Sequence, residues 1–139
     1  MGYTHYWRQD RGPATTEQWL AITNAFRTLL SHSPVPVQRE DDDNGPPMIT
    51  DQHIAFNGIG GAGHETMWMG KNAPGFNFCK TARKPYDLLV TALLILADHH
   101  APGVWDITSD GEVENWQPAL DLVNGKLPDQ YALPEGVRP

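Results

Sequence analysis

The residues best suited to chemistry in this chain lie together in one short basic segment, 75–84. Its sequence is GFNFCKTARK, and it stands directly before the most apolar stretch of the chain. Four of the ten Lys and Arg residues fall between Lys71 and Lys84, and no Asp or Glu lies between Thr66 and Tyr86. A local excess of positive charge favours the binding of an anion.

The side chains of this segment indicate how an anion would be held. Four polar residues precede the predicted start of a helix at Pro85: Lys80, Thr81, Arg83 and Lys84. The N–H groups in the first turn of a helix lack intrahelical partners and favour anions. Arg83 offers a planar fork for phosphate or carboxylate, Thr81 a hydroxyl donor, and Phe78 an aromatic face for stacking. The alternative interpretation is that these cations are solvated loop charges on an acidic protein.

Two other groups are candidates for ligand contact. The sequence GIGGAG at 58–63 is followed by His64 and Glu65, but it lacks the ending of a P-loop and does not open a predicted helix. A His beside a Glu suits acid–base catalysis, but neighbouring side chains of a strand point to opposite faces, which favours ligand contact instead. Three rings share one face of the predicted first strand and form either a pocket floor or part of the core: Tyr3, His5 and Trp7.

Cysteine and histidine patterns predict neither a nucleophile nor a metal site. Cys79 would need a His brought near by the fold, so packing is the favoured interpretation. His99 and His100 are adjacent, which is poor geometry for one tetrahedral site, and the chain contains no His-x-x-x-His or Cys-x-x-Cys pair. We expect these two histidines to complement the dipole of a helix end, and we predict no cofactor.

Composition limits the class of protein. The 139 residues suit a single domain, 40% of them are hydrophobic, and the net charge is −7. An acidic chain is a poor partner for duplex nucleic acid. One cysteine, the absence of an apolar leader and the absence of a long apolar run predict a cytoplasmic protein without membrane contact. A homo-oligomer remains open.

Periodicity and turn residues predict an α+β fold, a two-layer sandwich with the ferredoxin-like order β-α-β-β-α-β and an extra C-terminal helix. Strands are predicted at 2–8, 53–59, 64–69 and 104–108, and the first of them is expected to be central because both of its faces bear rings. Helices are predicted at 16–31, 85–99 and 115–124. An acidic loop at 39–52 (with EDDD at 40–43) and an irregular surface tail from about 127 complete the single domain, 1–139.

Three sequence motifs carry a resemblance to other proteins: MGYTHYW at the start, FNFCKTARKPYD in the middle, and SDG followed by ENW. With these motifs the chain resembles a family of small uncharacterised proteins of phages, prophages and bacteria, from Met1 to about Val123. The acidic loop departs from the pattern. The resemblance implies a phage-type accessory protein, acting in the host cytoplasm if phage-encoded, and it transfers no catalytic residues.

Three functional hypotheses follow. The first is a non-enzymatic binder of a small phosphate-bearing ligand, in which the basic segment holds phosphate and rings stack on a base; such a protein could sequester a nucleotide immune signal. The second is a hydrolase or transferase that acts on a nucleotide-like phosphate ester, with His64 or His5 as acid–base and the basic segment stabilising charge. The third is a protein-interaction module that inhibits a host defence enzyme.

Overall fold

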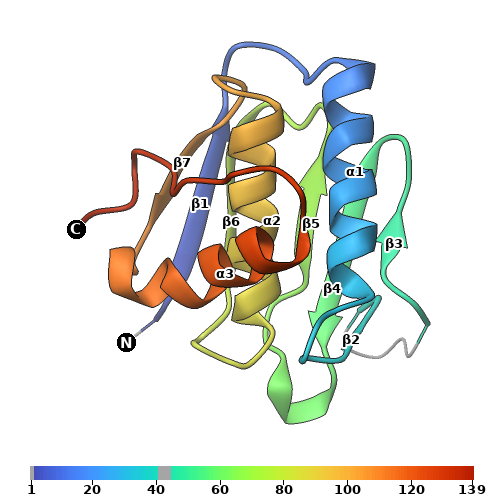
Figure 1. The fold of residues 1–139 in the computed structure, drawn as a ribbon, viewed down its shortest axis with the longest axis vertical. Coiled ribbons are helices and arrows are strands. Elements are labelled where there is room, and N and C mark those ends of the chain that lie inside the picture. The colour runs from blue at the N-terminus through green and yellow to red at the C-terminus, as the bar shows by residue number, and fades with distance from the viewer. Residues whose placement is uncertain (1, 41–44) are drawn as a thin grey trace.

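The computed structural model describes residues 2–40 and 45–139. Within these residues the protein is an α+β fold with three α-helices and two antiparallel sheets (Figure 1). The helices lie on one side of the strands, and the exposed rings of Phe76 and Phe78 lie on the other side, which we call the open face. Part of the predicted acidic loop, residues 41–44, lies outside the described residues, and it includes three of the four acids of the EDDD sequence.

The first sheet has the order β6-β1-β7 and consists of β1 (Thr4–Gln9), β6 (Gly75–Lys80) and β7 (Asp106–Ser109). β1 is the central strand, which confirms the expectation from its two aromatic faces. The register places Lys80 and Phe78 of β6 opposite Thr4 and Tyr6 of β1. These four side chains therefore share the open face of the sheet.

The second sheet is built around β4 (His53–Gly58). It pairs with β2 (Val37–Gln38), β3 (Met48–Ile49) and β5 (Met67–Gly70). The ferredoxin-like order is therefore wrong, because β1 does not pair with β4 or β5. Its partner is β6, a strand that the sequence analysis does not predict, and β5 pairs with β4 instead.

Two of the three α-helices begin with a capping box. In this motif the N-cap side chain accepts the backbone N–H of the residue three positions later, and the side chain of that residue accepts the N–H of the N-cap. α1 (Thr16–Leu30) is capped by Thr15 and Gln18, as predicted. α3 (Val113–Lys126) is capped by Glu112 and begins two residues earlier than predicted. α2 (Asp87–His100) has a continuous buried run from Leu89 to Ala97, so it is the central helix of the core.

The strand β1 shows why the core lies between the strands and the helices. His5, Trp7 and Gln9 are buried and alternate with exposed or half-exposed residues. The ring of Trp116 from α3 packs edge-on against His5. The face of β1 that bears Thr4, Tyr6 and Arg8 is the open one.

The tail after α3 has no regular structure, yet it is not confined to the surface. Leu127, Tyr131 and Val137 are buried, so the expectation of a surface tail is wrong for these three residues. Each is an apolar side chain that joins the core at intervals along an irregular backbone. Among the described residues, no helix is both long and apolar enough to span a bilayer.

Candidate ligand-binding site

A hollow of about 630 Å³ lies where the open face of the first sheet meets the turn that leads into α2. Its walls include Tyr3, Tyr6, Lys80, Arg83 and Asp110. Three residues predicted from the basic segment and the first strand, Tyr3, Lys80 and Arg83, therefore come together here. A smaller hollow of about 200 Å³, lined in part by Lys84 and Asp87, shares Arg83 with the first.

The backbone of the turn directs Arg83 back over β1. The N–H groups of Thr81 and Ala82 both donate to the carbonyl oxygen of Tyr3, at 3.1 and 3.2 Å. Ala82 and Arg83 adopt the left-handed conformation, with φ of 53° and 59°. This conformation is costly for residues with a Cβ, and such strain concentrates at functional sites. As a result the Arg83 guanidinium lies 4.0 Å from the centroid of the Tyr3 ring.

The cations of the basic segment are available for a ligand. No carboxylate of residues 2–40 or 45–139 lies within ion-pair distance of Lys80, Arg83 or Lys84. By contrast, Arg8 and Arg11 pair with Asp10 and Asp106, at 2.6 and 2.9 Å. The positive charge at the turn is therefore not neutralised by these acids.

A strip of exposed rings continues from the cations along the open face. The ring centroids of Tyr6 and Phe76 are 5.7 Å apart, and those of Phe76 and Phe78 are also 5.7 Å apart. Phe76 is 57% exposed and Phe78 is 53% exposed, unusually high fractions for side chains of this size. Rings presented in this way form a surface on which a planar group can stack.

A carboxylate borders both the rings and the cations. Asp110 accepts a hydrogen bond from the Tyr6 hydroxyl at 3.1 Å and from the Thr4 N–H at 3.0 Å. Burial raises the pKa of the Tyr6 phenol, and the hydrogen bond to Asp110 adds to this shift. Asp110 thus positions Tyr6. Its negatively charged oxygens are acceptors in the same hollow as the positively charged Lys80 and Arg83.

Beneath the hollow, His5 belongs to a buried polar network. Its Nδ1 lies 2.7 Å from Ser109 Oγ and its Nε2 lies 2.6 Å from Asp87 Oδ1. Ser109 Oγ also accepts N–H bonds from Gly111 and from the Trp116 indole, at 2.8 and 3.1 Å. These two bonds use both lone pairs of the oxygen, so its hydroxyl donates to Nδ1, and the imidazole proton is on Nε2 facing Asp87.

This network resembles a Ser-His-Asp triad in composition but not in reactivity. A nucleophilic serine needs a free lone pair facing substrate, and both lone pairs of Ser109 are hydrogen-bonded. The His5 ring is fully buried. The arrangement therefore joins β1, β7 and α2 and is not suited to acyl or phosphoryl transfer.

The Thr81 hydroxyl and the first N–H groups of α2 are already hydrogen-bonded within the protein. Thr81 is fully buried and its hydroxyl donates to Asp87 Oδ1 at 2.6 Å. The N–H groups of Asp87, Leu88 and Leu89 donate to the carbonyls of the preceding turn, at 2.9 to 3.4 Å. Since these donors are already used, the expectation of free N–H groups at this helix start is wrong.

His64 and Glu65 lie in the segment before β5, not in a strand as predicted, and both are exposed. Glu65 Oε1 accepts the N–H of Lys80 at 2.7 Å, so this side chain lies at the end of β6. The backbone of His64 is held by the buried side chain of Asn57, which bonds to both its N–H and its carbonyl.

Asn57 also explains the glycine-rich sequence before His64. A Cβ at Gly63 would collide with Asn57 Oδ1, and a Cβ at Gly58 would collide with the backbone of Ala62. The loop is therefore wrapped tightly around Asn57, and its glycines permit close packing. A ligand-binding role for the glycines is not needed to account for them.

Cys79 and Trp7 are core residues. Trp7 is 1% exposed, and its ring has no surface for a ligand. Cys79 is fully buried, and burial raises the pKa of its thiol to about 12, so it is unsuited to nucleophilic attack. His5, Trp7 and Thr81 are therefore not among the ligand contacts proposed below.

Sequence reasoning missed four residues that line the hollow: Gly2, Thr4, Tyr6 and Asp110. The alternation of β1 was a usable signal for Tyr6, since this residue stands on the face opposite Tyr3, His5 and Trp7. Asp110 follows β7 and reaches Tyr6 only through the pairing of β1 with β7.

Comparison of the chain with protein-family models, curated proteins and solved structures gave no match.

Proposed function

We propose that this protein binds a small ligand that combines a phosphate group with a planar ring, such as a nucleotide, on the open face of the β6-β1-β7 sheet. The observation that carries the proposal is the unneutralised pair Lys80 and Arg83 beside the exposed rings of Phe76 and Phe78. Glu65 and Lys84 flank this site at the end of β6 and in the turn.

The spacing suits one small ligand. Phe78 and Lys80 point to the same face of β6 two residues apart, which is about 6.7 Å along the strand. A base stacked on Phe78 would therefore place an attached phosphate near Lys80. Arg83 lies on the Tyr3 ring, which orients its guanidinium and leaves its edge to form paired bonds with phosphate oxygens.

The acidic residue in the hollow favours a small anion over a long polyanion. Asp110 would repel further phosphates, whereas its oxygens can accept hydrogen bonds from the hydroxyls of a sugar or the N–H groups of a base. Together with the net charge of −7, this argues against a nucleic-acid strand as ligand.

Binding without turnover is the favoured form of the proposal. Both nitrogens of His5 are engaged within the fold, and the lone pairs of Ser109 are occupied. The resemblance to small phage proteins supports sequestration of a nucleotide signal as the biological purpose. In that case the ligand would be held and returned unchanged.

The test is isothermal titration of the purified protein with mononucleotides, cyclic dinucleotides and ADP-ribose, followed by chromatography of the recovered ligand. We expect saturable binding of one class, with recovery of the intact ligand. Lys80→Glu and Arg83→Glu should each weaken binding by more than about tenfold, a change of about 1.4 kcal/mol. Lys126→Glu, a charge reversal at the far end of α3, is the matched control and should bind like wild type.

Absence of binding to every nucleotide class, or wild-type affinity in Arg83→Glu, would contradict the proposal. An altered ligand after incubation would favour the enzymatic hypothesis instead. The exposure of Phe76 and Phe78 also favours a second candidate, a protein partner on the same rings. A stoichiometric complex lost in Phe78→Ser but kept in Arg83→Glu would favour that candidate.

A further inference from the structure

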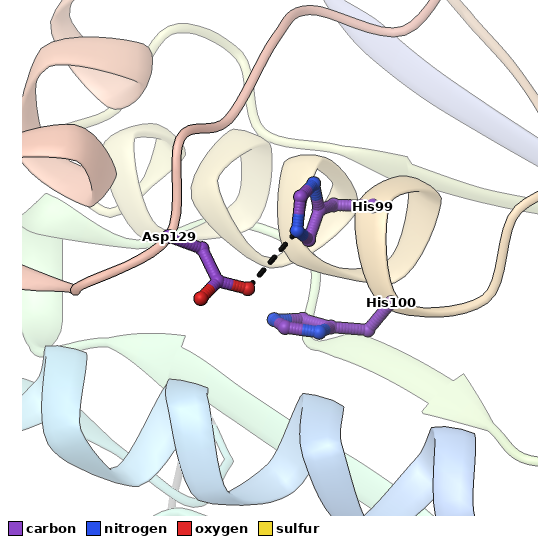
Figure 2. A group of neighbouring side chains, drawn as sticks. All are labelled: His99, His100 and Asp129. Atoms are coloured by element: carbon purple, nitrogen blue, oxygen red, sulfur yellow. Dashed lines mark hydrogen bonds and ion pairs between the residues drawn. The ribbon is translucent and has the colours of Figure 1, made fainter.

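Two segments distant in sequence bring three metal-ligating side chains together at the carboxyl end of α2. His99 and His100 are the last two residues of this helix, and Asp129 belongs to the tail. Among the residues that the structure describes, this is the group in which two imidazoles and a carboxylate gather, with one ligand atom from each within 4.8 Å of the others. Figure 2 shows the two rings and the carboxylate directed toward the same space.

The adjacency of the two histidines in the sequence predicted poor geometry for one metal site, and Asp129 lies 30 residues away from His99. In the structure, His99 Nε2 lies 3.1 Å from Asp129 Oδ2. The two imidazole rings are nearly perpendicular, at 86°, and their centroids are 4.8 Å apart. Adjacent histidines therefore do not point apart here, and the objection from adjacency fails.

Both segments are held in place by contacts outside the group. The Tyr131 hydroxyl lies 2.9 Å from His100 Nε2, and its ring centroid is 4.4 Å from that of His99. Tyr131 is itself anchored to α3, since its N–H donates to Asn124 Oδ1 at 2.7 Å and its carbonyl accepts from Asn124 Nδ2 at 3.2 Å. Tyr131 therefore fixes the positions of both imidazole rings relative to the tail.

We propose that His99, His100 and Asp129 bind a divalent transition metal of the zinc class. Two imidazoles and one carboxylate match the preferences of Zn²⁺ and Co²⁺ and differ from the all-oxygen sites of Ca²⁺ and Mg²⁺. Metal–ligand bonds of about 2.0 to 2.1 Å place tetrahedral ligands about 3.3 Å apart. The separation of His99 and Asp129 already fits this edge, and the third ligand needs a movement of about 1.5 Å or less.

The location indicates what the metal would do. The 14-residue α2 separates this group from the turn at Lys84 by about 21 Å, so the metal would not touch the ligand proposed above. Instead it would link the tail to the end of the central helix. The inference is therefore independent of the proposed function.

The test uses the full chain without a histidine tag. Isothermal titration with Zn²⁺ should show one saturable site per chain, and Co²⁺ should give the visible absorption of a tetrahedral complex. His99→Gln and Asp129→Asn should each weaken Zn²⁺ binding by about tenfold or more. Both positions are partly exposed, so these variants should fold. His32→Gln, an exposed histidine at the end of α1, is the matched control and should bind like wild type.

A thermal-shift measurement provides a second readout. Zn²⁺ should raise the melting temperature of wild type and of His32→Gln, and this rise should be lost in Asp129→Asn. Equal Zn²⁺ affinity in wild type, His99→Gln and Asp129→Asn would overturn the proposal. So would a loss of affinity in His32→Gln that equals the loss in the other variants, because that pattern indicates adventitious binding to surface histidines.

Discussion

The imidazole Nε2 of His5 lies 2.6 Å from Asp87 Oδ1, which joins the central strand of the first sheet to the first residue of the central helix. Asp87 Oδ1 also accepts the hydroxyl of Thr81, so one carboxylate oxygen ties β1, the turn after β6 and α2 together. Tyr3, which lines the hollow proposed to bind a ligand, packs edge-on against the ring of His5.

Removal of His5 should be costly for stability. His5→Leu is similar in size but removes from the buried network one hydrogen-bond partner of Asp87 and one of Ser109. We expect the free energy of unfolding to fall by about 2 to 4 kcal/mol, measured by urea denaturation. His64→Leu, at an exposed position, should change it by less than about 0.5 kcal/mol. Equal effects of the two substitutions would show that the network contributes nothing.

Cys79 should resist modification in the folded protein. Burial, followed by the nearby negative charges of Glu65 and Asp87, raises the pKa of its thiol to about 12, although a hydrogen bond with Tyr86 opposes this shift. At pH 8 the thiolate is therefore scarce and inaccessible. Iodoacetamide labelling followed by mass spectrometry should be at least about a hundredfold slower in buffer than in urea. Rapid labelling of the native protein would revive Cys79 as a nucleophile.

Stability should decline in alkaline solution. Burial raises the pKa of Tyr3 and of Tyr131 from 10.0 to about 12. The folded protein thus holds these protons more tightly than the unfolded chain, so their contribution is complete below pH 10 and is lost as the pH rises toward 12. The melting temperature should fall over this interval, together with a rise in tyrosinate absorbance. In Tyr3→Phe and Tyr131→Phe the fall should be smaller, and an unchanged pH dependence in both would contradict the assignment.

Replacement of alanine by glycine should have opposite effects on stability in the left-handed turn before α2 and within a helix. Ala82 has a φ of 53°, where glycine is favoured, so Ala82→Gly should raise stability by about 0.5 to 1 kcal/mol. Ala21 lies within α1, where the same change should lower stability by about 1 kcal/mol. Both values come from urea denaturation. Destabilisation by Ala82→Gly would show that the turn is not strained.

Local patterns were sufficient to predict the helices. The Thr15 and Gln18 capping box identified the start of α1, and the apolar run after Pro85 identified a buried helix. These elements depend on residues close in sequence, which is why sequence reasoning succeeds there. The pairing of strands depends on contacts distant in sequence, and the sheet order was accordingly wrong.

The strand β6 was not predicted for a different reason. Its residues alternate, with Phe76 and Phe78 exposed between less exposed Gly75, Asn77 and Cys79. The pattern typical of a strand was present, but the apolar rings occupy the open face, opposite to the usual orientation. The segment was interpreted as the approach to a helix because of its basic residues and the following Pro85.

Part of the candidate site followed from charge alone. The gap in acidic residues between Thr66 and Tyr86 predicted a local basic patch, and no described acid forms an ion pair with Lys80 or Arg83. The burial of His5 and Thr81, and the approach of Asp129 to His99, depend on how distant segments pack. No local sequence pattern contains that information.

The position of the tail beside β7 limits the association of one copy of this protein with another. β7 is at the edge of its sheet, and an edge strand can recruit a strand from another chain. The tail closes off this edge, because a Cβ at Gly136 would collide with the carbonyl of Ile107, and Val113 donates to the carbonyl of Arg138 at 2.7 Å. These contacts protect the edge of β7 from pairing with a strand of another chain. A chain shortened at Pro134 should therefore self-associate through β7.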